Sequence, residues 1–261
     1  MAKICPIFSG SSGNCTYVGY GENHILVDMG ASARGICNAL KGIGVNPSGI
    51  SAILITHEHS DHTSALKTFL KNYNTPVFAS KETVKALEND GRLPEGFKCN
   101  EICGKFTVGN AEIVRFATSH DCAGSSGYVF NFNDGTRVAV CTDLGIVTDE
   151  IRENLLGCRA VMIESNHDVM MLQNGSYPYP LKRRILSETG HLSNGACAAE
   201  LPELVRNGTK RIILAHLSQE NNHPSVAKSC SVATLMAEGL IEDKDYTIYV
   251  APISHGEMIV L

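Results

Sequence analysis

Three histidines and an aspartate fall within six consecutive positions of the sequence, in the segment HEHSDH. His57 and His59 occupy alternate positions of an extended turn, so their imidazoles can face the same ion. Asp61 and His62 follow at the start of a predicted helix and can face a second ion nearby. Neutral imidazole and carboxylate groups suit zinc, manganese or iron. The pattern predicts a metal site, and the alternative is a surface turn that is rich in histidine by chance.

Polar residues gather where short apolar runs of the chain end. The runs AILIT, RFAT, VAVCT, VMIE and IILA lead directly into HEHSDH, SHD, DLG, SNHD and HLS. Because layered sheets place sites at such edges, where loops converge, we expect His120, Asp143 and His216 to be further metal ligands. The two oxygens of Asp143 would allow it to bridge two ions.

The runs themselves are rich in valine, isoleucine, phenylalanine or tyrosine and are bounded by turn residues, which is typical of β-strands. The predicted strands are 3–9, 15–20, 24–28, 52–56, 75–79, 111–118, 127–132, 137–142, 160–164, 211–216, 246–251 and 257–261. The predicted helices are 32–40, 60–71, 81–88, 149–156, 193–205 and 225–238. This order predicts an α+β protein of two packed sheets covered by helices, in one domain spanning residues 1–261.

Composition limits the partners and the compartment. The net charge of −5 argues against a surface coated with nucleic-acid-binding lysines, so affinity for phosphate must come from a local patch or from a metal. The chain has neither an apolar run of membrane-spanning length nor the pattern of a signal peptide, which predicts a cytoplasmic protein. The ten cysteines are scattered, which favours reduced thiols over a disulfide framework.

The pattern His57-x-His59-x-Asp61-His62, preceded by Asp28 and followed by His120, Asp143 and His216, resembles the complete motif set of the metallo-β-lactamase-fold superfamily. The resemblance covers nearly the whole chain and implies a four-layer αββα sandwich. It implies that His57, His59 and His120 bind one metal ion and that Asp61, His62 and His216 bind a second. Asp143 would bridge the ions, and Asp28 would orient the ligands through hydrogen bonds.

The superfamily hosts many reactions, and several features exclude individual branches. A secreted β-lactamase needs an export signal, which is absent. Flavodiiron-type oxygen chemistry has glutamate in place of His59. The β-CASP nucleases carry a large insert between the bridging aspartate and the last histidine, and here that interval is 216 − 143 = 73 residues, which is too short.

Longer sequence motifs favour one branch of the superfamily. Residues 164–194 (ESNHDVMMLQNGSYPYPLKRRILSETGHLSN), together with LAHLSQENN and SGSSGN, resemble the YycJ/WalJ family. That family is described as metal-dependent 5′-to-3′ DNA exonucleases of the bacterial cytoplasm. The resemblance implies a DNA substrate and hydrolysis of phosphodiester bonds by a hydroxide shared between two metal ions.

Candidate catalytic and substrate-binding residues lie in the same segments. His191 resembles the histidine that tRNase Z-like enzymes place opposite the metals, where it would protonate the leaving oxygen with Glu164 as its partner. Asp61 and Asp143 would take part in catalysis as well as in metal binding. The remaining candidates would contact phosphate and are Ser9, Ser11, Ser12, Asn14, Asn166, His167, Lys182, Arg183 and Arg184. The alternatives are a plain hairpin loop at SGSSGN, a helix start at GHLS and a solvated helix face for the basic cluster.

Two rival functions stay open at this point. One is a hydrolase of the same fold that acts on a thioester, a lactone or a cyclic nucleotide. The other is a non-catalytic binding module, against which the intact ligand set argues. A basic cluster at residues 182–184 that lines the mouth of the site would favour nucleic acid. The native metal and the oligomeric state cannot be predicted from these residues.

Overall fold

Two seven-stranded mixed sheets form the centre of the computed structural model, which describes all residues 1–261. The first sheet contains, in spatial order, β14 (Ile259–Val260), β1 (Ala2–Phe8), β2 (Cys15–Tyr20), β3 (Asn23–Val27), β4 (Ala52–Leu54), β5 (Val77–Ser80) and β6 (Asn100–Ile102). The second contains β13 (Thr247–Val250), β12 (Arg211–Ala215), β11 (Ala160–Glu164), β10 (Arg137–Cys141), β9 (Ser126–Phe132), β8 (Ala111–Ala117) and β7 (Lys105–Val108).

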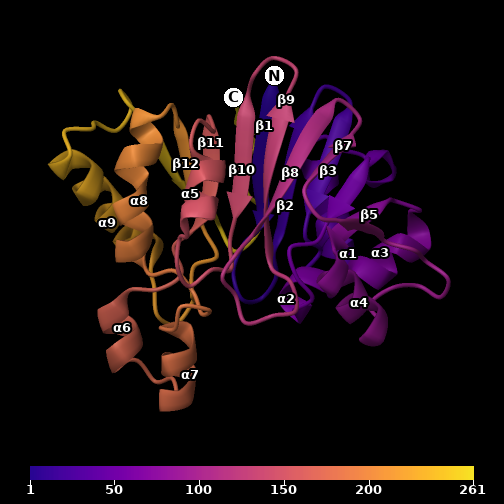
Figure 1. Cartoon of the computed structure of the whole chain (residues 1–261), viewed down its shortest axis with the longest axis horizontal. Helices are drawn as coiled ribbons and strands as arrows, with labels where there is room; N and C mark the ends of the chain where they lie inside the picture. Colours follow the sequence, from indigo (N-terminus) through magenta and orange to yellow (C-terminus); the bar gives the residue numbers. More distant parts are fainter.

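Helices cover the outer face of each sheet (Figure 1). On the first sheet lie α1 (Ala33–Gly42), α3 (Leu66–Asn72) and α4 (Lys81–Asn89), and on the second lie α5 (Asp149–Leu155), α8 (Asn194–Arg206) and α9 (Pro224–Ala237). Three buried clusters hold these layers together: one between the sheets, and one between each sheet and its helices. The predicted four-layer αββα sandwich is therefore confirmed. No helix has both the length and the apolar character needed to cross a membrane.

The polar ends of the strands meet at one end of the sandwich. Strands β3, β4 and β5 run parallel in the first sheet, and β10, β11 and β12 run parallel in the second. Their carboxyl ends therefore point the same way in each sheet. The short helix α2 (Ser60–Thr63) and the pair α6 (Val169–Asn174) and α7 (Tyr179–Ile185) lie at this end, opposite the two termini (Figure 1).

Most predicted elements are present, with five differences. The helix predicted over 60–71 is divided into α2 and α3, because the Ala65 amide donates to the Met29 carbonyl and the Asp61 carbonyl accepts from the Asn14 amide. The short strands β6 and β7 and the helices α6 and α7 were not predicted. Each is seven residues or shorter and carries too little apolar periodicity to be recognised in the sequence.

Buried hydrogen bonds join the two sheets directly, and one of them involves Tyr128. The Tyr128 hydroxyl in β9 donates to the Ile55 carbonyl, just after β4, over 2.6 Å. Both residues are fully buried, so Tyr128→Phe would leave that carbonyl without a partner. We expect the substitution to lower the free energy of unfolding by about 1–3 kcal/mol in urea denaturation. Tyr246→Phe is the matched control, because the buried Tyr246 hydroxyl has no partner and its loss should not destabilise. Equal stability of the two variants would contradict this role for Tyr128.

Candidate metal centre

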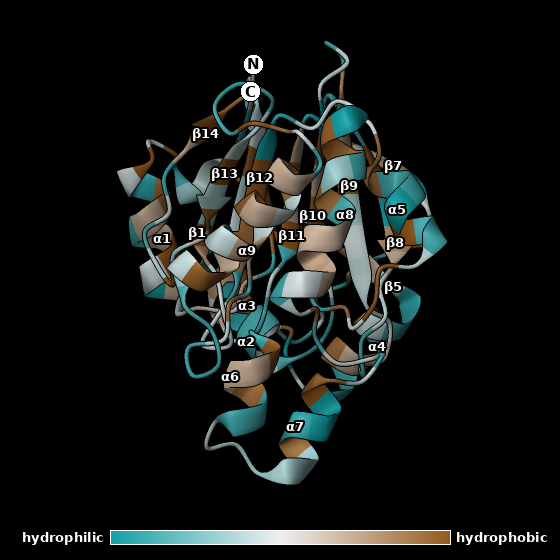
Figure 2. Cartoon of the chain, turned by 90° about the vertical axis from the view of Figure 1, so that its left-hand side faces the viewer, coloured by the Kyte–Doolittle hydropathy of each residue, from teal (hydrophilic) through white to brown (hydrophobic).

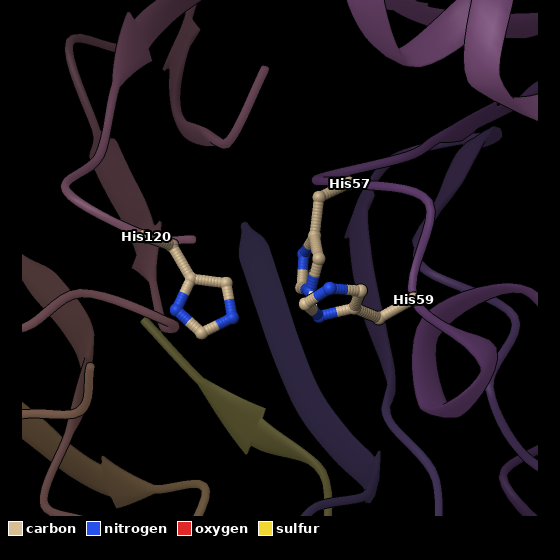
Figure 3. A group of neighbouring side chains, drawn as sticks. All are labelled: His57, His59 and His120. Atoms are coloured by element: carbon tan, nitrogen blue, oxygen red, sulfur yellow. Dashed lines mark hydrogen bonds between the residues drawn. The ribbon is translucent and has the colours of Figure 1, made fainter. Parts of the chain in front are cut away.

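Histidines from both sheets face one another at the carboxyl ends of the strands. His57 and His59 lie on the loop after β4, and His120 approaches from the segment after β8 in the other sheet (Figure 3). Only 3.0 Å separates His57 Nε2 from His59 Nδ1. One ligand atom from each of the three residues lies within 4.8 Å of the others. These are the residues that the sequence assigns to the first metal ion.

A second group lies beside the first and consists of Asp61, His62 and His216, which the sequence assigns to the second ion. His62 Nε2 is 3.4 Å from an oxygen of Asp61 and 3.4 Å from Asp143 Oδ2. Asp143 also groups with His57 and His62, so it stands between the two sets. Its Oδ2 is buried and has no hydrogen-bond partner. The geometry therefore leaves this oxygen free for a cation.

Four of the five candidate ligand histidines form contacts through their Nδ1 atoms. This leaves Nε2 of each ring to face the centre. The contacts of Nδ1 are His57 to Thr56 Oγ1 (3.0 Å), His62 to Asp28 Oδ2 (2.8 Å), His120 to the Gly190 carbonyl (3.0 Å) and His216 to Glu164 Oε1 (2.8 Å). Partners of this kind fix the tautomer and orientation of metal-binding histidines. Asp28, predicted to orient ligands, makes such a contact.

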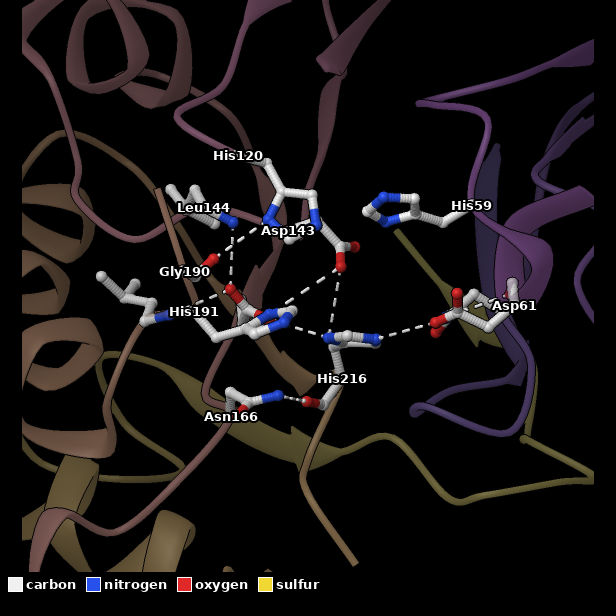
Figure 4. A network of polar contacts seen from close by, with 12 residues as sticks. His59, Asp61, His120, Asp143, Leu144, Asn166, Gly190, His191 and His216 are labelled. Carbon is white, nitrogen blue, oxygen red and sulfur yellow. Dashed lines mark hydrogen bonds and ion pairs between the residues drawn. The ribbon is translucent and has the colours of Figure 1, made fainter. Parts of the chain in front are cut away.

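Glu164 connects two functional histidines to the backbone. These histidines, His191 and His216, lie side by side in Figure 4. Its Oε1 accepts from His191 Nδ1 and from His216 Nδ1, each over 2.8 Å. Its Oε2 accepts from the amides of Leu144 and Leu192, each over 3.1 Å. The carboxylate is fully buried, and four donors satisfy its two oxygens. The structure thus brings together His191 and Glu164, the pair proposed from the sequence.

Three residues of the site have a left-handed backbone conformation. Asp28, Asp143 and His216 have φ values of 65°, 60° and 56°, and each follows the end of a strand. This region is unfavourable for residues other than glycine, and such residues gather at functional sites. The turn lets the side chain of each residue leave the sheet edge and enter the cluster.

The charges of the cluster balance one another. Burial alone would raise the pKa of Asp143, but His216 and His62 hold it well below its ordinary value. Burial would lower the pKa of His216, but Asp143 and its neighbouring carboxylates raise it to about 10. Burial lowers the pKa of His57 and that of His120, which keeps both imidazoles neutral. A neutral imidazole is the form that binds a metal.

The donor set fits divalent metal ions. It consists of imidazole nitrogens and carboxylate oxygens, two of which are buried without hydrogen-bond partners of their own. His216 Nε2 is one of these buried unpartnered atoms. Polar atoms of this kind are costly inside a protein unless a partner is present, and a cation is the partner that they share.

A cavity of about 250 Å³ opens over the cluster. Its lining includes the site residues His59, Asp61, His120, Asp143, His191 and His216 and, of the predicted phosphate contacts, Ser11, Asn166 and Arg184. The others lie elsewhere. The Ser9 hydroxyl accepts from the His216 amide, and Ser12 accepts from Gln219. Asn14 lies behind Asp61 and His62, with its amide nitrogen 3.1 Å from His62 Nε2. His167 is buried outside the cavity lining.

The basic cluster separates in the structure, and of its three predicted phosphate contacts Arg184 lines the cavity. Lys182 Nζ donates to the carbonyls of Gln173 and Gly175, so it joins α7 to α6. Arg183 is exposed and outside the cavity lining. Arg184 lines the cavity and forms a two-pronged ion pair with Asp121. Helical spacing is the reason, because neighbours in a helix point in different directions.

Several residues of the site were not predicted. Thr56 donates to Asp28 and contacts His57, and Asp121 holds Arg184. Tyr177 and Leu181 line the cavity. Tertiary contacts alone give Thr56 and Asp121 their roles, and no local pattern marks them. The sequence PYPLKRRI could have indicated a short helix after a proline, with Leu181 on its apolar face.

Comparison with known proteins identifies the class to which this fold and site belong. The family model described as a β-lactamase superfamily domain matches residues 23–217. This chain belongs to the β-lactamase superfamily. The metallo-β-lactamase fold protein YhfI from Bacillus subtilis shares the fold, with a TM-score of 0.74 at 14% identity over 99% of this chain and 98% of that one.

Two relatives narrow the class. Exodeoxyribonuclease YycJ of Bacillus anthracis is 40% identical over 232 residues, which are 88% of this chain and 87% of that protein. Exodeoxyribonuclease WalJ of Streptococcus pneumoniae is 38% identical over 251 residues, which are 95% of this chain and 93% of that protein. These matches confirm the resemblance to the YycJ/WalJ family that residues 164–194 indicated.

Proposed function

We propose that this chain is a metal-dependent 5′-to-3′ exodeoxyribonuclease of the cytoplasm, acting as one domain of residues 1–261. The observation that carries the proposal is the cluster of seven candidate ligands at the junction of the two sheets, in a chain 38–40% identical to named exodeoxyribonucleases. The proposal includes two divalent ions, of zinc, manganese or iron, because the ligand atoms fall into two groups with Asp143 between them.

Each side chain has a role in this proposal. His57, His59 and His120 would hold one ion, and Asp61, His62 and His216 the other, with Asp143 shared between them. The ions would supply an activated water and neutralise charge on the phosphate.

His191 would act from a position beside His120 and His216. Its Nδ1 donates to Glu164, and in the protonated ring Nε2 would give a proton to the departing oxygen. Arg184 and Asn166 line the same cavity and would contact the phosphate.

The rival reading as a small-substrate hydrolase has less support. One of the three cations of the basic cluster, Arg184, reaches the cavity, and its partner Asp121 holds it there. A charge fixed at the entrance of a site is suited to an anionic polymer. A non-catalytic module would not need the buried, unpartnered ligand atoms seen here.

A substrate panel tests this function. Purified protein with added Mn²⁺ or Zn²⁺ is expected to release nucleotides from the 5′ end of phosphorylated DNA and to act poorly on RNA or a cyclic nucleotide. A chelator should abolish the activity and lower the melting temperature, because the cations that stabilise the folded state are removed. Metal should restore both. Hydrolysis of a cyclic nucleotide without degradation of any nucleic acid would refute the proposal in favour of the small-substrate rival.

A further inference from the structure

Helices α6 and α7 form an arm that projects from the sandwich at the end that holds the metal centre (Figure 2). Lys182 fastens the arm internally through its bonds to the carbonyls of Gln173 and Gly175. Arg184 fastens it to the body through Asp121, which follows His120 directly. The arm is therefore held in a defined position beside the metal centre.

One face of this arm is apolar and faces the cavity. Tyr177 lies just before α7, and Leu181 and Ile185 are four residues apart on one side of the helix. All three line the cavity whose other wall is the cluster of imidazoles and carboxylates. We name these three residues the platform. Tyr179, by contrast, is 73% exposed and does not line the cavity.

A cation lies at the edge of the platform. The Arg184 guanidinium uses its Nε and Nη2 atoms for Asp121, which leaves Nη1 without a protein partner. Arginine presents its donors in a rigid fork that suits phosphate oxygens. The cavity thus combines a metal-binding wall, an apolar wall and a fixed cation.

This combination matches one nucleotide. A phosphate would lie against the metal-binding wall, and the base would lie on the platform, where an aromatic ring can stack on it. The platform offers no amide, carboxylate or basic group that could read a base edge, so it would accept any base. The cavity of about 250 Å³ is small, so we take it to hold one base and not a base pair.

We propose that Tyr177, Leu181 and Ile185 hold the base of the nucleotide being removed, separated from its partner base, with Arg184 on the neighbouring phosphate. The inference rests on the proposed nuclease function and adds the form of its substrate. That substrate is a DNA end whose terminal base is unpaired, with any base at that position.

The test compares three 5′-phosphorylated duplexes that differ only at the terminal 5′ nucleotide. In the first this nucleotide is paired, in the second it is mismatched, and in the third it is abasic. The initial rate of release of the first nucleotide is measured with Mn²⁺ present. Wild-type protein should cleave the mismatched end faster than the paired end. It should lose roughly 5- to 150-fold in kcat/KM when the terminal base is missing.

Tyr177→Ala should lower kcat/KM on the mismatched end by about the same factor. On the abasic end it should change kcat/KM little, because the contact between the ring and the base is already absent there. Tyr177→Phe should retain the wild-type rates, since stacking needs the ring and not the hydroxyl. Tyr179→Ala, at the exposed start of α7, should match wild type. If Tyr177→Ala is unstable in thermal unfolding, Tyr177→Leu should show the same selective loss.

Three results would overturn the inference. The first is an equal rate of wild-type protein on the mismatched and abasic ends, which leaves the nuclease function standing without the platform. The second is an equal loss by Tyr177→Ala on both of these ends, which is the mark of a structural role. The third is an equal rate on paired and mismatched ends, which removes the need for an open terminus. Wild-type protein that cleaves no DNA would instead refute the nuclease function, and the platform with it.

Discussion

Asp143→Asn is expected to reduce turnover by more than about 100-fold while the chain stays folded. Loss of a residue that only orients a metal ligand already costs about 10- to 100-fold, and Asp143 stands among the ligand atoms themselves. Asparagine has almost the same shape, so the chain should stay folded, with some loss of stability because His62 and His216 lose a nearby carboxylate. The measurement is the rate of DNA degradation, with circular dichroism and thermal unfolding as checks of the fold.

The choice of asparagine matters because Asp143 has a φ of 60°. Asparagine tolerates this backbone conformation, whereas alanine there costs about 1–2 kcal/mol. Asp143→Ala should therefore lose activity equally and melt at a lower temperature. Asp243→Asn is the matched control, since Asp243 has a φ of 65° and is exposed far from the site. Substantial metal-dependent turnover by well-folded Asp143→Asn protein would refute the assignment of this residue.

Glu164→Gln is expected to weaken both the fold and the metal centre. Four donors converge on the carboxylate, and the glutamine amide group would face two of them with hydrogens of its own. Breaking a buried ionic network of this kind costs about 3–5 kcal/mol of folding free energy. Because His216 would lose the partner of its Nδ1, metal affinity should fall by about 10- to 100-fold.

The two effects of Glu164→Gln can be measured separately. Urea unfolding of the metal-free protein reports the fold, and competition with a chelator reports metal affinity. Glu200→Gln is the control, because Glu200 pairs with Arg152 on the outer helices, away from the site. That variant should keep the metal affinity of the wild type. An unchanged affinity in Glu164→Gln as well would show that His216 is oriented without this carboxylate.

The ligands could be predicted because they follow strands that local sequence identifies. His57, Asp143 and His216 each come directly after an apolar run, and parallel strands bring such ends to one edge. The grouping of His57 and His59 with His120 also follows from the family resemblance, and the structure brings the three together.

What was missed depends on contacts between distant segments. Arg184 and Lys182 are two residues apart, so helical spacing alone predicts that they point in different directions, but the position of the α6–α7 arm decides which of them reaches the cavity. Tyr177 lies in a loop without periodicity, and nothing local connects it to the metal centre. The left-handed backbone of Asp28 is likewise a property of the folded strand end.

The division of the ligands between two sheets has a consequence for how the protein is made. His57 and His62 belong to the first sheet, and His120 and His216 approach from the second, so neither half holds a complete set. The first sheet also needs β14, which pairs Val260 with Lys3 across almost the entire chain. Contacts this distant in sequence close slowly. A partly synthesised chain that lacks residues 211–216 therefore carries its first histidines without a finished site.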